Sequence, residues 1–393
     1  MKATEIPVGT EIHRKAAEIV PVLRRRAPWA EENRRLHMET VEAMADAGIF
    51  KLRVPARYGG YEADTRTLAA VAAELARGDG SAAWTASVWW IPTWMACLFP
   101  DEVQDEVFAT PDVRVCGTLS PSATAAPADG GIVVDGRWGF ISGALHSHWQ
   151  EIIAVMPGED GGMRPVMALV PMADLHVVDD WHTSGLRGSG SVSTVADRLF
   201  VPRERVLPLG AVLAGDGVSE VNRDSPVYRA PLLPVASASS VGTVLGLTAA
   251  ARDAFFDRLP GRGITYTGYD EQRQAAVTHF EVAEARLRAD EAHYHADRLT
   301  DLVDRGRGPD EPWTLEERAR ARAWMGRVVQ AGKESVDVLA SASGGSSIYR
   351  DSPIQRIQRD MQAITMHALM HPSTNYELYG RVLCGLEPGT LYL

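Results

Sequence analysis

The sequence changes character twice along its length, and this order constrains the fold more than any other feature. Residues 1–111 carry apolar side chains at helical spacing, whereas residues 112–221 hold short β-branched segments separated by turns rich in Gly, Pro and Asp. Residues 222–393 return to long amphipathic helical patterns. We therefore expect an N-terminal α-helical domain, a central antiparallel β-sandwich or barrel, and a C-terminal four-helix bundle over these three ranges.

The composition excludes several classes of protein. Hydrophobic residues make up 45% of the chain and charged residues 23%, values typical of a globular protein and not of a disordered one. The chain is acidic, with a formal net charge of −11 and no basic run. Binding to a phosphate backbone or to an anionic membrane surface depends on clustered basic side chains. We therefore expect no nucleic acid and no membrane among the partners.

Three further features predict a cytoplasmic protein. Cys97, Cys116 and Cys384 lie far apart and form no CxxC pair, which indicates reduced thiols. The first twenty residues lack the apolar segment of a signal peptide. The longest apolar stretch, 84–99, contains Pro92 and is shorter than the ~20 residues that a membrane span needs.

Four segments combine glycines, aromatic residues and charged residues in a distinctive way. They are ADAGIFKLRVPARYGG (45–60), DGRWGFISGALHSHW (135–149), SGLRGSGSVSTVADRLFVPRERV (184–206) and GGSSIYRDSPIQRIQRD (344–360). Their order, together with the helix, strand and helix zones, resembles the acyl-CoA dehydrogenase fold over nearly the whole chain. The resemblance implies an α+β multidomain protein in which several of these segments lie against a flavin.

The acidic residues that acyl-CoA dehydrogenases use as a base are missing. In the commonest version a Glu follows the Arg–Asp pair by a short helical step, and counting from Arg359 and Asp360 places Ala368 there, next to His367. The alternative Glu, on the first helix of the C-terminal bundle, is also absent, because residues 225–252 contain no Asp or Glu. Dehydrogenation requires a carboxylate to take the acyl α-proton, so this mechanism is disfavoured.

The C-terminal segment RDMQAITMHALMHPSTNYELYGRVLCGLEP (359–388) instead resembles the two-component flavin-dependent monooxygenases that share this fold, often called group D. The resemblance implies hydroxylation of an aromatic or indole-like small molecule, such as a natural-product intermediate, through a C4a-hydroperoxide formed from reduced FAD or FMN and O2. The reduced flavin would come from a separate NAD(P)H:flavin reductase, and the chain has no GxGxxG motif between a strand and a helix. The resemblance also implies a homotetramer built as a dimer of dimers.

The resemblance assigns the catalytic chemistry to two side chains. His367 matches the family's C-terminal active-site histidine and would act as a base on the substrate, since imidazole titrates in the useful pH range. Ser142 would hydrogen-bond flavin N5 and stabilise the hydroperoxide as a donor. Without the resemblance, these residues would be interpreted as a core or interface histidine and as a turn serine before Gly143.

Three more residues are candidates for the substrate pocket. Trp84 and Trp90 lie on a tryptophan-rich helix that we expect Pro92 to break. For this helix an aromatic core is the plainer interpretation and an aromatic substrate pocket the sharper one. His371 follows His367 by one helical turn and would share its face. The two histidines lack the Glu of an HExxH motif, so we expect no metal site.

The remaining candidates would hold the flavin. The polar residues after the first β-branched segment, the Gly–Ser loop around residue 189 and the Gly–Gly stretch before the Arg–Asp pair all match flavin-contacting segments of the family. The plainer interpretations are turn capping, a loop pinned by its arginine, and a surface loop; in the family, the last stretch often reaches flavin phosphate or adenine across a subunit boundary. These candidates are Thr118, Ser120, Ser142, Arg187, Ser189, Gly344, Gly345 and Arg350.

Three alternatives remain open from the sequence. The first keeps the flavin and oxygenates the nitrogen of an amino sugar, or sulfur, in place of an aromatic carbon. The second is an acyl-CoA dehydrogenase with a relocated base. The third is a non-catalytic flavin-binding protein with the same fold.

Overall fold

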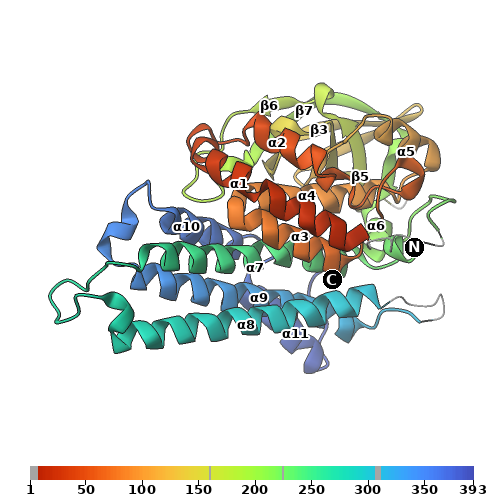
Figure 1. Cartoon of the computed structure of the whole chain (residues 1–393). Helices are drawn as coiled ribbons and strands as arrows, with labels where there is room; N and C mark the ends of the chain where they lie inside the picture. The colour runs from red at the N-terminus through yellow and green to blue at the C-terminus, as the bar shows by residue number, and fades with distance from the viewer. Residues whose placement is uncertain (1–7, 159–160, 224, 306–310) are drawn as a thin grey trace, which may run out of the picture.

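A computed structural model describes residues 8–158, 161–223, 225–305 and 311–393 of the chain. Figure 1 shows the β-sheet and the N-terminal helices stacked on the long C-terminal helices α7, α8 and α9. The sheet therefore meets the bundle through the N-terminal helices, and α4 in particular contacts both the sheet and α7. The helical, β and helical regions expected from the sequence follow one another in this order along the chain.

Five helices form the described part of the N-terminal region, and two of them begin at clear capping residues. Asp64 accepts a hydrogen bond from Thr67 N at 2.8 Å, and Asp79 accepts one from Ser81 N at 3.0 Å, so each carboxylate satisfies a free N–H of the first turn. The helices are α1 (Val8–Asn33), α2 (Met38–Asp46), α3 (Thr65–Gly78), α4 (Gly80–Ala96) and α5 (Asp101–Phe108).

The expectation that Pro92 breaks the tryptophan-rich helix is wrong, because α4 continues through it to Ala96. Nearly every side chain of α4 is buried, Trp89 and Trp94 among them. Packing on all sides therefore outweighs the ~3 kcal/mol that proline costs in a helix interior.

Eight strands form one sheet, in the order β6-β7-β3-β2-β4-β5-β8, with β1 paired to β4. The residues Asp129–Gly130–Gly131 are typical of a hairpin turn, and β2 and β3 pair antiparallel across them, with Gly130 at φ +76°. The sheet is mixed and not purely antiparallel, because β4 pairs in parallel with both β1 and β2. The strands are β1 (Val115–Gly117), β2 (Ala123–Ala128), β3 (Gly131–Ile141), β4 (Trp149–Pro157), β5 (Met163–Pro171), β6 (His176–Val178), β7 (Val192–Pro202) and β8 (Val206–Pro208).

The C-terminal helices pack as the predicted bundle of α7, α8, α9 and α10, with α11 against α9. Helix α7 is apolar all round and long enough to cross a membrane, but 94% of its most apolar window is buried inside the protein. It is therefore the central helix of the bundle. The helices are α6 (Leu209–Ala214), α7 (Leu232–Arg258), α8 (Ala276–Asp304), α9 (Leu315–Ala342), α10 (Pro353–Thr365) and α11 (Pro372–Leu383).

Short 3-10 turns connect many of these elements. They lie at Ile49–Lys51, Ala56–Tyr58, Ala144–His146, Met172–Asp174, Arg187–Ser189, Arg203–Arg205, Pro226–Tyr228, Gln272–Gln274 and Gly345–Ile348. The turn at Ala144–His146 follows β3, and the turn at Arg187–Ser189 precedes β7. Because β3 and β7 pair antiparallel, the turn after β3 and the turn before β7 lie at the same end of this strand pair.

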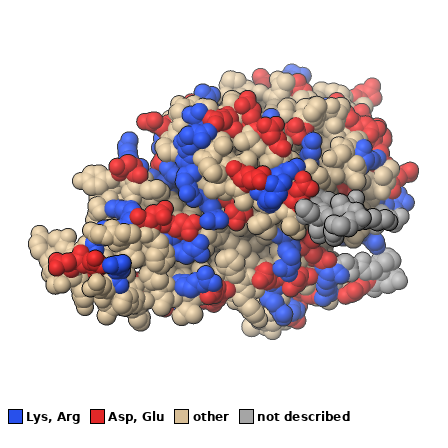
Figure 2. All heavy atoms as spheres, in the orientation of Figure 1, with Lys and Arg blue, Asp and Glu red and all other residues tan. Residues whose placement is uncertain are grey.

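Figure 2 shows acidic and basic side chains interspersed over the face of the molecule that it presents. Arg34 with Asp179 and Arg66 with Asp297 are examples of exposed ion pairs. The visible face thus offers no continuous basic surface of the kind that binds a polyanion.

Candidate functional site

Three elements meet where β3 ends, and each brings one of the residues singled out from the sequence. The Trp84 indole on α4 donates a hydrogen bond from Nε1 to Ser142 Oγ at 3.2 Å. The ring of His367, two residues after α10, lies edge to face against Trp84 with 5.0 Å between ring centroids. Ser142 is only 5% exposed. The structure therefore joins Ser142, Trp84 and His367 into one cluster.

Glycine is required at position 143 for the end of β3 to pack this closely against α4. Its φ is +75°, and a Cβ at this position would lie 2.5 Å from Trp89 Nε1. Only glycine combines this left-handed conformation with so close an approach to α4. The glycine of the FISG segment therefore allows the end of β3 to pack against the helix that carries Trp84.

A chain of serine hydroxyls leads away from Ser142. Its Oγ lies 2.8 Å from Ser191 Oγ, which lies 2.6 Å from Ser189 Oγ. Ser189 Oγ donates to the carbonyl oxygen of Leu186 at 2.7 Å. All three serines are buried, so these contacts are shielded from water.

The Arg–Asp pair of α10 anchors the loop at the end of this chain. Asp360 Oδ1 accepts a hydrogen bond from Leu186 N at 2.6 Å, and Arg359 donates to the carbonyl of Ser184. Burial, with a smaller contribution from the neighbouring Asp79 carboxylate, raises the pKa of Asp360 to about 7. Leu186 adopts a left-handed φ of +50°, which the Asp360 bond helps to hold.

His367 is an exposed residue, although protein groups, the Trp84 ring among them, pack closely around its imidazole. This burial, with a smaller contribution from the Arg322 guanidinium, lowers the pKa of His367 to about 4. The imidazole is therefore neutral at neutral pH. Its Nδ1 accepts a 3.3 Å hydrogen bond from Leu369 N, which assigns the ring hydrogen to Nε2.

The residues around this cluster suit a flat, apolar ligand with polar edges. Phe140 and Leu145 flank Ser142 in the chain, and Met366 precedes His367. Phe140 is 76% exposed and Met366 70%, which is unusual for large apolar side chains beside buried hydrogen-bonding groups. A flavin ring system needs such a surface together with hydrogen bonds at N5 and along its edge, so the residues present fit a flavin.

Three other residues that were predicted to hold the flavin lie in connecting segments and turns. Thr118 and Ser120 lie between β1 and β2, and Ser120 is exposed. Arg187 uses its guanidinium to hold the loop, because Nε donates to the carbonyl of Glu31 and Nη1 to that of Thr183. This geometry favours the plainer interpretation of Arg187, as a residue that pins the Gly–Ser loop.

Several candidates lie away from the cluster. Trp90 Nε1 donates to the carbonyl of Ile49 inside the N-terminal core, at 2.8 Å. Gly344, Gly345 and Arg350 precede α10, whereas His367 follows it, and a helix of its 13 residues is about 20 Å long. Within the described ranges, no hydrogen bond, ion pair or ring contact joins these four residues to Ser142 or His367.

His371 lies beside the cluster, directly before α11. Its backbone N donates to the carbonyl of His367 at 3.0 Å. Its Nδ1 is buried and has no hydrogen-bond partner among the described residues. His371 is therefore near His367, but both lie in the turn between α10 and α11 and not on one helix, so the shared helix face expected from their spacing is wrong. The described part of the chain gathers no group of three His, Cys, Asp or Glu side chains suited to a metal ion.

The sequence interpretation missed Ser191 and the anchoring role of Asp360. Ser189 and Ser191 are two residues apart just before β7, and this spacing is the one sequence signal that they could lie on one side. Nothing in the sequence indicates that Leu186 bonds to Asp360, which is 174 residues away.

Comparisons with known proteins identify the family. The model "Acyl-CoA dehydrogenase, N-terminal domain" matches residues 12–108, and "Acyl-CoA dehydrogenase, C-terminal domain" matches residues 238–372. The chain is 30% identical to the flavin-dependent monooxygenase, oxygenase subunit HsaA, of Rhodococcus jostii (strain RHA1), over 94% of this chain and 97% of that protein. It is 28% identical to the FADH(2)-dependent resorcinol hydroxylase, oxygenase component, of Rhizobium sp. (strain MTP-10005), over 96% and 95%.

A solved structure agrees with these sequence relatives. XiaF from Streptomyces sp., determined in complex with FADH2 and glycerol, superposes with a TM-score of 0.87 at 29% identity, covering 98% of this chain and 97% of that one. The predicted fold, flavin and enzyme class are confirmed. The chain belongs to the flavin-dependent monooxygenases with the acyl-CoA dehydrogenase fold, oxygenase components that use reduced flavin and O2 and depend on a separate reductase.

Proposed function

We propose that this oxygenase hydroxylates an aromatic or indole-like small molecule, with His367 and Ser142 as its catalytic residues. One observation carries this proposal: Trp84, the partner of both residues, presents an indole ring between them. Aromatic rings bind flat ligands by stacking and by edge contacts. The hydroxylase relatives named for phenolic substrates support the same substrate class.

His367 is proposed as the proton acceptor. When bound, the reduced flavin activates O2, and one oxygen atom is transferred to the substrate while the other leaves as water. Removing an O–H or N–H proton makes the substrate ring more electron-rich. The neutral imidazole accepts this proton at Nδ1, whose 3.3 Å bond from Leu369 N is long and easily given up.

The flavin is proposed to lie over the exposed apolar residues, with N5 at Ser142. Thr118, Ser120 and Ser189 then border the ring, and Arg187 holds the loop that contains Ser189. Gly344, Gly345 and Arg350 lie too far along the bundle to reach the same flavin. We assign these three to the flavin of a second copy of the chain.

This assignment requires an oligomer, and α8 offers a surface for one. Phe280, Leu287 and Tyr294 recur every seven residues and are exposed by 74%, 65% and 60%. Such a stripe lies along one side of a helix and is typical of helix–helix association. We propose that it contributes to a homotetramer, in the cytoplasm, that receives reduced flavin from its reductase. Phe280→Glu should reduce the mass measured by light scattering, and an unchanged mass would remove this helix from the interface.

Isotope incorporation tests the proposed function. The protein is loaded with reduced FAD or FMN without O2, mixed with 18O2, and offered phenols and indoles, an amino sugar and a thioether in separate reactions. We expect one 18O atom in an aromatic product, and loss of this product in His367→Asn. Oxygenation of the amino sugar or thioether with no aromatic product would overturn the proposed substrate class.

A further inference from the structure

A buried arginine of α9 holds the beginning of α11. Arg322 is only 6% exposed, and its Nε donates a 2.8 Å hydrogen bond to the side-chain oxygen of Asn375, which is completely buried. A guanidinium can only donate hydrogen bonds. The amide oxygen of Asn375 must therefore face Arg322, and the NH2 group of the same amide must point the other way.

The NH2 group of Asn375 bonds to the turn that contains His367. It has two hydrogens, and it donates to the carbonyl oxygen of Leu369 at 2.9 Å and to that of His371 at 3.0 Å. The backbone N–H groups of these two residues both bond to His367, one at the imidazole Nδ1 and the other at the carbonyl oxygen. Asn375 therefore fixes both residues that hold His367.

The guanidinium of Arg322 has a second partner in the segment after α11. Its Nη1 donates to the carbonyl oxygen of Tyr392 at 2.6 Å. The Tyr392 hydroxyl in turn donates to the carbonyl oxygen of Leu119 at 2.8 Å, between β1 and β2. Leu119 lies between Thr118 and Ser120, the two residues of this segment that are proposed to border the flavin ring. One arginine thus connects the flavin-bordering segment with the turn before α11.

We propose that Arg322 is a positioning residue that sets the distance between the flavin and the proton-accepting side chain of His367. Asn375 is its contact to the turn before α11, and Tyr392 is its contact to the segment between β1 and β2. A displacement of about 1 Å between reacting groups can cost about 100-fold in rate, so the spacing of these two segments matters for the reaction. The inference rests on the proposed function, which assigns the base and the position of the flavin.

The test measures flavin affinity and hydroxylation separately. Oxidised and dithionite-reduced FAD and FMN are titrated anaerobically into the full-length protein and its variants. The aromatic product formed per reduced flavin is then measured in single turnovers with O2 at saturating flavin. Tyr392→Phe removes only the hydrogen bond to Leu119. Both flavin forms should bind about fivefold more weakly, while the product yield should equal that of the wild type.

Asn375→Asp tests the other contact. The aspartate keeps an acceptor for Arg322 but loses both donated hydrogens, and its second oxygen faces the carbonyls of Leu369 and His371. Flavin affinity should stay unchanged. The product yield should fall about tenfold, because the displaced His367 leaves the reduced flavin to be oxidised by O2 with release of hydrogen peroxide and no transfer to the substrate.

Two arginine variants complete the test. Arg322→Lys keeps the charge but lacks the planar fork that bonds to both acceptors, so flavin affinity and product yield should both fall. Arg320→Lys is the matched control on the same helix. Arg320 donates to Glu316 one turn earlier on α9, so neither quantity should change.

The outcomes distinguish this inference from the proposed function. Proportional losses of affinity and yield in Tyr392→Phe and in Asn375→Asp, with lower melting temperatures, would show a merely structural network and overturn the inference. Wild-type values of both quantities in all variants would also overturn it. Full product yield in His367→Asn would instead count against the proposed function. The loss of flavin affinity in Tyr392→Phe but not in Asn375→Asp would still support the connection to the flavin.

Discussion

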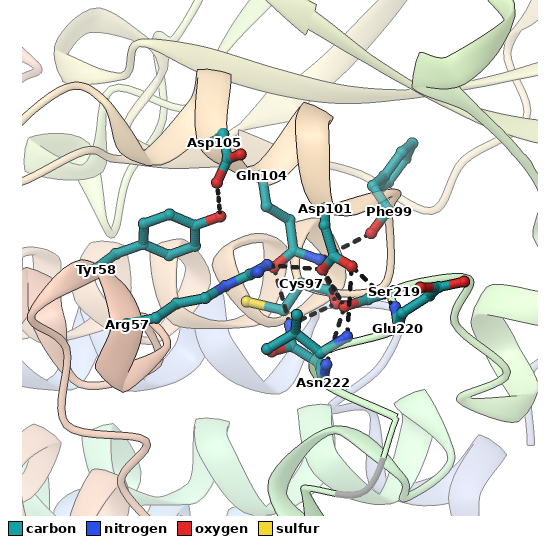
Figure 3. Close-up of polar contacts among 11 residues, drawn as sticks. Arg57, Tyr58, Cys97, Phe99, Asp101, Gln104, Asp105, Ser219, Glu220 and Asn222 are labelled. Carbon is teal, nitrogen blue, oxygen red and sulfur yellow. Dashed lines mark hydrogen bonds and ion pairs between the residues drawn. The ribbon is translucent and has the colours of Figure 1, made fainter.

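Two polar networks lie inside this molecule, and they end differently. The first, which we call the Arg57 network, joins Arg57, Asp101, Gln104, Ser219 and Asn222 between α5 and the segment before α7 (Figure 3). The second is the chain from Leu186 to Ser142. The members of the Arg57 network bond to one another, whereas the serine chain ends at the Ser142 hydroxyl, which has hydrogen-bonding capacity left after its contacts with Ser191 and Trp84.

The closed network satisfies its members through one another. Arg57 Nη2 donates to Asp101 at 2.8 Å and to Gln104 at 2.9 Å, as Figure 3 shows. Gln104 in turn donates to the carbonyls of Cys97 and Phe99. Asn222 donates to the same Cys97 carbonyl and to the side-chain oxygen of Gln104.

The comparison shows how to distinguish a buried polar network that stabilises the fold from one that binds a ligand. A network in which every donor meets an acceptor rigidifies the fold and leaves no group to bind a further partner. A chain that ends in an unsatisfied polar group beside exposed apolar residues is suited to binding a ligand. Four substitutions test this distinction, from the largest expected effect to the smallest.

Replacing His367 with Asn should reduce hydroxylation by about 10²–10⁴-fold, the range typical of a lost general base. Because the ring is partly open to solvent, the melting temperature should stay nearly unchanged. In the wild type, the neutral imidazole should be lost only as pH falls through about 4, so the rate should not follow the ordinary histidine titration.

Steady-state rates and differential scanning fluorimetry check this prediction together. His13→Asn, at an exposed histidine of α1, serves as the control and should keep full activity. A large drop in melting temperature with intact activity would assign His367 to the structure and not to catalysis.

Replacing Asp101 with Ala should destabilise the protein by about 3 kcal/mol, because Arg57, Ser219 and the amide of Glu220 lose their shared acceptor. Urea unfolding measures the free energy. The affinity ratio for the two flavin forms should remain that of the wild type. Asp105→Ala removes a carboxylate that bonds only the Tyr58 hydroxyl in this region and should cost less than half as much. A change in the flavin ratio would connect the two networks and break the comparison.

Asp360 predicts a pH dependence of stability. The pKa of Asp360 is raised from the usual 3.8 to about 7 in the folded protein. The stability that the protonated carboxyl contributes to the folded state is therefore fully present below pH 3.8 and is lost as pH rises through about 7. Asp360→Asn keeps an acceptor for Leu186 N and does not ionise. The variant should therefore gain stability relative to the wild type between pH 4 and 8, by on the order of 2 kcal/mol.

Urea unfolding at several pH values checks the sign. Asp290→Asn, an exposed carboxylate on α8, should give a difference from the wild type that does not grow over this range. A wild type that gains stability relative to Asp360→Asn as pH rises would contradict the prediction.

Replacing Ser142 with Ala should have the smallest effect, about 1 kcal/mol or a threefold to tenfold loss of affinity for reduced flavin. Oxidised flavin, which carries no hydrogen on N5, should lose less affinity than reduced flavin. Anaerobic fluorescence titration measures both constants. Equal losses for the two forms would place flavin N5 elsewhere.

The sequence allowed much of this description to be predicted. Helical periodicity in residues 10–111 and 222–393, and β-branched segments between them, predicted the three zones because such patterns record which face of each element is buried. The motifs around Ser142 and His367 predicted two members of the cluster through resemblance. The purely antiparallel sheet and the break at Pro92 were wrong, because strand pairing and burial depend on distant neighbours.

What the sequence by itself determined was the order of the elements, the family and the chemical nature of the candidate residues. Only the tertiary structure decided which of them meet: Trp84 and not Trp90 at Ser142, and Asp360 at Leu186. It also decided that Ser142 meets Ser191 and, through Ser191, Ser189. The physical reason is that a hydroxyl's role depends on its partners' donors and acceptors, and folding brings those partners together from distant parts of the chain.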